Sequence, residues 1–221
     1  PGRAERIAAT FEEPKLVARN REYVLYTGKT KAGSPISVCS TGIGGPSASI
    51  AVEELVRIGA THFIRVGSAG GRQPGTPIGS VVVVTSAFRG EGTSLDYIPL
   101  GYPAAADIDV TLALRQAAAE YLGKPALEGV VYTRDAFYRR DDGLNKVLTD
   151  AGVLAAEQEC STFFVVGSLL KVKVGAILGT DSNIYLDPQP TREEKEALYQ
   201  QVERETIAIA SAAVDRLHAA Q

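Results

Sequence analysis

The hydrophobic and polar positions along the chain follow two spacings, one typical of strands and one typical of helices. Short apolar runs, rich in β-branched residues, predict buried strands at residues 36–39, 62–66, 79–88, 128–132 and 172–178. Apolar residues at helical spacing predict helices at residues 50–58, 109–122, 144–151, 160–170 and 191–219. Because strands alternate with helices, we expect an α/β protein: one domain over residues 1–221, a three-layer α/β/α sandwich around a mixed, mostly parallel central sheet.

Residues at the ends of these segments support the assignment. Pro46 stands at the first helical position after a glycine-rich loop, and Gly59 ends that helix. Thr191 and Glu194 form the pattern of a capping box at the start of the last helix. Residues 89–107 follow neither spacing and are long for an irregular segment, which indicates a function or an interface.

Charge and composition exclude several classes of protein. The net charge is −3, from 23 basic and 26 acidic residues, so we expect neither nucleic acid nor an anionic membrane as a partner. The longest apolar runs fall far short of the roughly 20 residues of a membrane span, and no signal peptide is visible. Two cysteines, without a CxxC pair, indicate a reducing, cytoplasmic setting rather than a disulfide framework.

Two histidines are too few for a structural zinc site or a Ser-His-Asp triad, so no metal is expected and both are interpreted as incidental. The sequence contains no methionine, and we therefore expect further residues before Pro1 in the full protein.

The segment STGIGGPSASIAVEEL, residues 40–55, places three glycines between a predicted strand and a predicted helix. It has no lysine after its glycines, which excludes a Walker A loop. A dinucleotide fingerprint is excluded because Ser47 stands where the third glycine is needed for close packing. The loop still suits an anion, since glycines allow close backbone approach and the helix start presents free N–H groups. A tight turn without a ligand remains the alternative.

Arg65 favours the anion over the plain turn. It lies between Ile64 and Val66 in a predicted buried strand, where an unpaired charge costs several kcal/mol. Strand ends of this kind are where α/β sheets bind ligands, so we expect Arg65 to meet an anion there.

These segments together resemble the family I nucleoside phosphorylases, the hexameric purine nucleoside and uridine phosphorylases. Residues 40–50, with Glu54 and Leu55, match the family's glycine-loop motif at every fixed position. Four further matches occur in the family's order and span nearly the whole chain: the end of a Gly-Asp-Pro-x-Arg loop at Gly2-Arg3, an arginine segment at 19–23, a second at 64–70, and the Glu-x-Glu ribose motif at 157–159.

The resemblance implies reversible phosphorolysis of a nucleoside to the free base and ribose 1-phosphate. This is the reaction of a pentosyltransferase of nucleoside salvage, with inorganic phosphate as co-substrate and no other cofactor. It also implies a homo-oligomer: dimers with shared active sites, assembled into a hexamer as a trimer of dimers. The residues expected before Pro1 would include a phosphate-binding glycine and a histidine donated between subunits.

The family's site residues carry over by position. Phosphate would be bound by Arg3, Arg65 and Ser68, with Arg21 reaching it from a neighbouring subunit; the alternative for Arg21 is a solvated surface charge. Nucleoside binding would involve Ser68, Gly70, Phe137, Gln158, Glu159 and Asp181. Glu159 would accept hydrogen bonds from the ribose hydroxyls, or else be a plain helix-start carboxylate. Arg65, Glu159 and Asp181 form the predicted catalytic set.

The motifs disagree on the identity of the base. Residues 21–24, 44–47, 91–97 and 135–138 resemble the uridine branch. Asp181 instead stands where the purine branch keeps an acid that protonates the base, and a raised pKa would suit that role. Its alternative is a turn cap, because Asp-Ser-Asn is typical of turns. Motif counts favour uridine, with a purine nucleoside as the alternative.

Two departures from the family pattern weaken both base assignments. The uridine branch carries a Gln-x-Arg segment that grips the uracil edge, whereas here Tyr138 passes directly to Arg139-Arg140. Either arginine could substitute, or both are solvated charges. Gln158 replaces the family's usual methionine beside the sugar. A non-catalytic nucleoside-binding member of the fold is therefore the second alternative.

Overall fold

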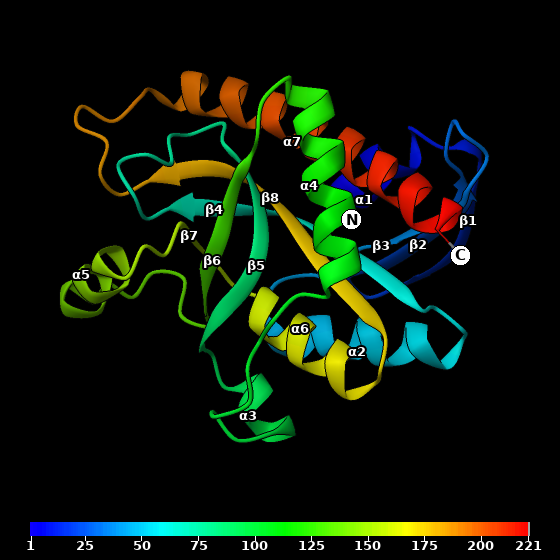
Figure 1. Ribbon diagram of the computed structural model, residues 1–221, viewed down its shortest axis with the longest axis horizontal. Coiled ribbons are helices and arrows are strands. Elements are labelled where there is room, and N and C mark those ends of the chain that lie inside the picture. The colour runs from blue at the N-terminus through cyan, green and yellow to red at the C-terminus, as the bar shows by residue number, and fades with distance from the viewer. Residues whose placement is uncertain (221) are drawn as a thin grey trace.

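The computed structural model describes residues 1–220, and Figure 1 shows the arrangement of its helices and strands. The helices are α1 (Gly2–Ala8), α2 (Gly45–Arg57), α3 (Thr93–Tyr97), α4 (Ile108–Leu122), α5 (Asp142–Asp150), α6 (Cys160–Leu169) and α7 (Arg192–Ala219). The strands are β1 (Glu12–Asn20), β2 (Tyr23–Lys29), β3 (Pro35–Cys39), β4 (His62–Gly71), β5 (Val81–Gly90), β6 (Leu127–Arg134), β7 (Ala155–Glu157) and β8 (Lys173–Asn183).

Five strands form a mixed sheet that closes on itself as a barrel, in the order β4-β7-β6-β5-β8. The pairs β4/β8, β5/β6 and β6/β7 are parallel, whereas β5/β8 and β4/β7 are antiparallel. Strand β5 shows why these runs are apolar at successive positions. Val82 and Val84 belong to one hydrophobic core, whereas Val81 and Val83 belong to another. Both faces of the strand are therefore buried.

Helices cover the strands on two sides (Figure 1). Helices α4 and α7 pack with Val110, Leu114 and Ile209 on one side, and α6, with α2 beside it, packs with Phe164 on the other. The predicted α/β class, with a mixed sheet between helical layers, is thus confirmed.

A separate three-stranded antiparallel sheet, β1-β2-β3, was not predicted. Residues 36–39 were assigned to the central sheet, and that assignment is wrong: they pair only with β2 in this smaller sheet. Every residue of β1 is exposed, so the strand lacks the apolar run by which the buried strands were found. No element was predicted before residue 36, although Val24 of β2 and Ala4 and Ala8 of α1 are buried.

Strand β4 continues five residues past its predicted end at Val66, through a run that includes three glycines. A Cβ on Gly67 would lie 1.7 Å from a guanidinium nitrogen of Arg65, and one on Gly71 would lie 2.5 Å from a backbone oxygen of Thr76. The glycines therefore mark close approaches inside a strand and not the loop that their sequence suggests.

The irregular segment 89–107 is organised by one buried side chain. The Arg89 guanidinium donates to the carbonyls of Ser94, Ile98, Pro99 and Tyr102 at 2.7–2.8 Å. Helix α3 lies within this segment, whose backbone carbonyls are held together by the hydrogen bonds from Arg89.

The capping box predicted for the last helix is confirmed, with Thr191 and Glu194 exchanging hydrogen bonds at the start of α7. Within residues 1–220, no helix combines the length and the apolar character that crossing a membrane requires.

Candidate active site

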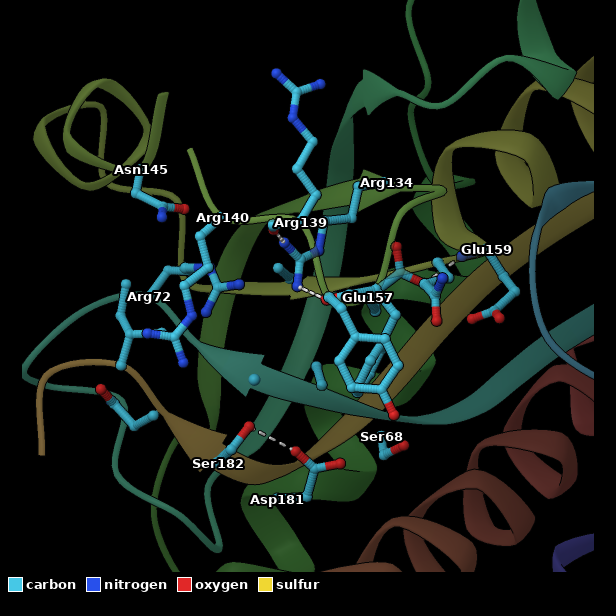
Figure 2. A pocket seen from close by; sticks show the side chains of 18 of the residues that line it. Ser68, Arg72, Arg134, Arg139, Arg140, Asn145, Glu157, Glu159, Asp181 and Ser182 are labelled. Carbon is cyan, nitrogen blue, oxygen red and sulfur yellow. Dashed lines mark hydrogen bonds between the residues drawn. The ribbon is translucent and has the colours of Figure 1, made fainter. Parts of the chain in front are cut away.

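A cleft of about 1310 Å³ opens where the carboxyl ends of β4, β6 and β8 come together (Figure 2). Eight of the nine residues predicted for the site line this cleft: Arg3, Arg65, Ser68, Gly70, Phe137, Gln158, Glu159 and Asp181. Arg21 does not. It lies exposed in the turn between β1 and β2. That it binds phosphate in the site of a neighbouring subunit stays a prediction. No residue of the 89–107 segment lines the cleft.

Arg65 is a buried cation held between two carboxylates. Its side chain is 13% exposed, and its Nη2 forms an ion pair with Glu157 at 3.0 Å and a shorter one with Glu159. Burial alone would lower the pKa of the guanidinium, but the two carboxylates more than offset burial and raise it. Its Nη1 is buried without any hydrogen-bond partner among residues 1–220. Arg65 lines the cleft, so its guanidinium, with this nitrogen unpartnered, can donate to an anion there.

Glu157 fixes the position of Glu159 relative to Arg65. It accepts hydrogen bonds from the backbone N–H groups of Glu159 and Cys160 at 2.8 and 2.9 Å and from the Thr133 hydroxyl at 2.5 Å. These bonds fix the start of α6, and with it the Glu159 side chain. The sequence motif included Glu157, but its supporting role was not predicted, because its partners are backbone groups and a distant strand.

Glu159 accepts a hydrogen bond from the backbone N–H of Gly44 at 2.7 Å. Burial raises the pKa of its carboxyl, but Arg65 and the Gly44 N–H more than offset burial and lower the pKa below its ordinary value. Glu159 therefore stays ionised and can accept hydrogen bonds from hydroxyl groups in the cleft.

The glycine loop acts differently from the prediction. Thr41, Gly42 and Ile43 line the cleft, whereas the first residues of α2 do not. A Cβ on Gly45 would lie 2.6 Å from the hydroxyl oxygens of Thr93 and Thr162, so this glycine allows α2 to pack closely on its neighbours. The loop reaches the site through its Gly44 bond to Glu159 and not through the helix N-terminus.

Arg3 enters the cleft from α1. Its guanidinium donates to Tyr199 at 2.6 Å and to the Ser68 hydroxyl at 3.4 Å, and it forms an ion pair with Glu203 at 3.0 Å. Glu203 also binds Arg6. The structure thus brings Arg3 and Ser68 together, as predicted. The roles of Tyr199 and Glu203 could not be predicted, since their partner Arg3 lies on α1, far away in the sequence.

Asp181 is the extra residue of a β-bulge. Its neighbours Thr180 and Ser182 pair with the consecutive residues Ala69 and Gly70, so Asp181 has no partner on β4. Burial raises the pKa of its carboxyl, which a hydrogen bond from the Ser182 hydroxyl at 2.8 Å and the charge of Arg3 only partly offset. A carboxyl with a raised pKa can donate a proton. Bulges commonly redirect side chains beside active sites.

The Phe137–Tyr138 pair stands at the mouth of the cleft with its side chains mostly exposed, the rings in edge-to-face contact at 5.0 Å. Arg134 holds this loop by donating to the carbonyls of Phe137 and Arg139, both at 2.8 Å. The Gln158 amide donates to the backbone carbonyl of Asp135 at 2.8 Å. That bond accounts for a polar residue where the family pattern has an apolar one.

Arg72 is the residue that sequence reasoning missed. It follows Gly70 and Gly71 on β4, beyond the predicted end of the strand, and is 6% exposed. Arg72 and Glu159 lie on opposite sides of the pocket in Figure 2. We call the region of Arg65, Glu157 and Glu159 the Arg65 end, and that of Arg72, Arg134 and Phe137 the Arg72 end. The signal in the sequence that could have indicated this residue was an arginine directly after Gly70 and Gly71.

No group of three or more histidine, cysteine or acidic side chains among residues 1–220 is arranged to hold a metal ion. The cleft presents guanidinium, carboxyl and hydroxyl groups. An anion at the Arg65 end and a polyhydroxyl group against Glu159 would lie side by side, with a proton donor at Asp181.

Comparisons with known proteins agree with this geometry. A family model described as the Phosphorylase superfamily matches residues 1–215. The uridine phosphorylase of Treponema pallidum is 46% identical over 189 residues, which cover 80% of this chain and 72% of that protein. A guanosine phosphorylase of Halorubrum lacusprofundi is 40% identical over 184 residues, covering 83% and 76%.

The crystal structure of uridine phosphorylase from Vibrio fischeri superposes with a TM-score of 0.87 at 35% identity, covering 98% of this chain and 89% of that one. The resemblance seen in the sequence and the fold expected from it are both confirmed. The motifs, the barrel with its covering helices and the family match over nearly the whole length agree: the chain belongs to the phosphorylase superfamily.

Proposed function

We propose that the protein is a uridine phosphorylase, a pentosyltransferase that converts uridine and inorganic phosphate reversibly to uracil and ribose 1-phosphate. The observation that carries the proposal is Arg65, whose Nη1 is buried and unpartnered in the cleft beside an ionised Glu159. A free guanidinium edge binds phosphate, and an adjacent carboxylate binds ribose hydroxyls. The uridine phosphorylases among its relatives support uridine as the nucleoside.

The mechanism follows from the charges that develop. When the bond between C1′ and the base breaks, the ribose gains oxocarbenium character and the base gains negative charge. Phosphate held by Arg65, Arg3 and Ser68 stabilises the first charge and then forms the new bond to C1′. Glu159 orients the ribose. Catalysis is thus positioning and electrostatic stabilisation, each well-placed group contributing several kcal/mol, without a covalent enzyme intermediate.

The proposal includes an assembly and a cellular role. Arg21 would complete the phosphate site of a neighbouring subunit, in dimers that assemble as a trimer into a hexamer. The exposed position of Arg21 on the β1–β2 turn is compatible with that contact. The enzyme would act in the cytoplasm, in nucleoside salvage, with phosphate as its only co-substrate.

A second candidate is a purine nucleoside phosphorylase, favoured by Asp181. Its raised pKa would let it protonate a departing purine. A guanosine phosphorylase also stands among the relatives. Uridine phosphorolysis needs no such proton donor, so Asp181 is the residue on which the two candidates differ.

The test is base release by the full-length protein from uridine, thymidine, inosine, adenosine and methylthioadenosine, each with and without phosphate. We expect uracil and ribose 1-phosphate to form only when phosphate is present. Release without phosphate would make the protein a nucleoside hydrolase. Nucleoside binding by calorimetry without any release would make it a non-catalytic member of the fold.

A further inference from the structure

Arg72 carries a buried charge that no carboxylate among residues 1–220 neutralises. Its Nε has no hydrogen-bond partner, and its Nη1 makes one long bond of 3.4 Å to the Gly71 carbonyl. It forms no ion pair with a carboxylate anywhere in residues 1–220, whereas Arg65 has two such partners. A guanidinium in this state is costly unless something that enters the cleft pairs with it.

The position of Arg72 relates it to the substrate. Its Nη1 lies 3.7 Å from the place of a Cβ on Gly70, and Gly70 lines the cleft. Along β4 and the residue directly after it, the cleft residues therefore follow one another from Arg65 through Ser68 and Gly70 to Arg72. With phosphate and ribose at the Arg65 end, as proposed above, the part of a nucleoside that points toward Arg72 is the base (Figure 2).

The electrostatics of the Arg72 end select what can bind there. Burial, followed by repulsion from Arg134, lowers the pKa of the Arg72 guanidinium. The side chain offers hydrogen-bond donors and no acceptor. A base edge with an amino group would leave these donors unpaired, whereas a keto oxygen or an anion would pair with them.

We propose that Arg72 determines base specificity, by binding keto oxygens of the base and stabilising the negative charge that the base acquires as it leaves. The inference rests on the proposed function. The pair of electrons from the broken bond to C1′ moves onto the ring nitrogen and delocalises onto the keto oxygens. A phosphate oxygen forms the new bond to C1′. Arg72 keeps its proton, and water later protonates the free base.

The substrate class follows from this assignment. Uridine and inosine carry a keto oxygen where cytidine and adenosine carry an amino group. The wild-type protein should therefore favour uridine over cytidine and inosine over adenosine, and Arg72→Gln should reduce both preferences. Because a hydrogen bond to a charged group is lost, we expect kcat/KM for uridine to fall about 10- to 100-fold. Arg57→Gln, which removes an exposed arginine from α2, is the matched control and should retain full activity.

The effect of the leaving group separates charge stabilisation from a structural role. 5-Fluorouracil leaves as a more stable anion than uracil and needs less help from a guanidinium. Arg72→Gln should therefore lose less activity on 5-fluorouridine than on uridine, while the shift in Tm caused by phosphate stays as in the wild type. An equal loss on both nucleosides, or unchanged preferences among the four natural ones, would overturn the inference and leave the phosphorylase proposal standing.

A binding measurement tests Arg72 independently of activity. 5-Nitrouracil is anionic at neutral pH, whereas uracil is neutral. Calorimetry in the presence of phosphate should give tighter binding of 5-nitrouracil than of uracil to the wild type, and that difference should be lost in Arg72→Gln. If the difference persists in Arg72→Gln, the inference fails. If wild-type protein releases no base from any nucleoside but this difference is found, the proposed function fails and the anion-binding role of Arg72 remains.

Discussion

The two ends of the cleft differ in whether the protein itself neutralises the buried guanidinium. At the Arg65 end, a cation, two carboxylates and several backbone N–H groups satisfy one another, and one buried guanidinium nitrogen has no partner within residues 1–220. At the Arg72 end, a buried cation has no counterion within residues 1–220, and the neighbouring aromatic pair is exposed on a loop. The first end is organised before any substrate arrives, whereas the second needs the substrate to complete it. Under the two proposals above, reaction type would depend on the first end and choice of base on the second.

The largest effect is expected for Arg65→Leu. Losing the preorganised charge should reduce kcat/KM for phosphorolysis about 1000-fold, and leaving Glu157 and Glu159 unpaired should destabilise the fold by about 3–5 kcal/mol. Steady-state kinetics and urea unfolding measure the two losses. The double variant Arg65→Leu/Glu159→Gln should regain part of the stability and none of the activity. Phosphate that still raised the Tm of both variants would show that the anion site lies elsewhere.

Glu159→Gln comes next, because it removes the proposed ribose acceptor and one partner of Arg65. We expect kcat/KM for uridine to fall about 100-fold, and for 2′-deoxyuridine by a smaller factor, since that substrate has one hydroxyl fewer to lose. Parallel assays on both nucleosides give the ratio. The same factor on both would assign Glu159 to holding Arg65 and not to binding ribose.

Asp181→Asn separates purine from pyrimidine chemistry, and its effect should be about 10-fold on inosine and under about 2-fold on uridine. Burial raises the pKa of the carboxyl, so its protonated form persists to higher pH than for an ordinary aspartate. Wild-type inosine turnover should accordingly fall as pH rises through that pKa. Uridine turnover should show no such fall. Equal losses on both nucleosides would remove Asp181 from the role of purine-specific acid.

The smallest effect concerns stability against pH. Because the pKa of Glu159 is lower in the folded protein than in the unfolded chain, its contribution is present above the ordinary glutamate pKa. That contribution is lost as pH falls through the folded pKa. Urea unfolding between neutral and acid pH should therefore show a shallower decline in Glu159→Gln than in the wild type. Identical slopes would mean that the Arg65 pair contributes nothing measurable to the pH dependence.

Arg65 and Glu159 could be predicted to share one site because the motif that contains each of them is local. The motifs around Gly44, Arg65 and Glu159 each lie on one short segment, and the fold brings three such segments together. What escaped prediction depends on contacts between distant segments, such as the bonds of Glu203 on α7 to Arg3 on α1. The exposed strand β1 escaped because its residues carry no buried pattern.

Arg72 was missed for a related reason. A run of glycines predicts the end of a strand, but the close approaches at Gly67 and Gly71 require glycine within the strand itself. Once β4 is extended by those residues, Arg72 becomes part of the cleft. Backbone crowding of this kind depends on the partner segment, and the sequence of β4 alone does not contain it.

The bulge at Asp181 also bears on how this enzyme could change through evolution. Since Asp181 is the one residue of β8 without a partner opposite it, deleting it would leave Thr180 and Ser182 adjacent, facing the already adjacent Ala69 and Gly70. An uninterrupted parallel ladder would then run the length of both strands. A three-nucleotide deletion in the gene could thus remove the Asp181 carboxyl while keeping the register of the barrel. Substrate range in this fold is open to change by codon loss as well as by point substitution.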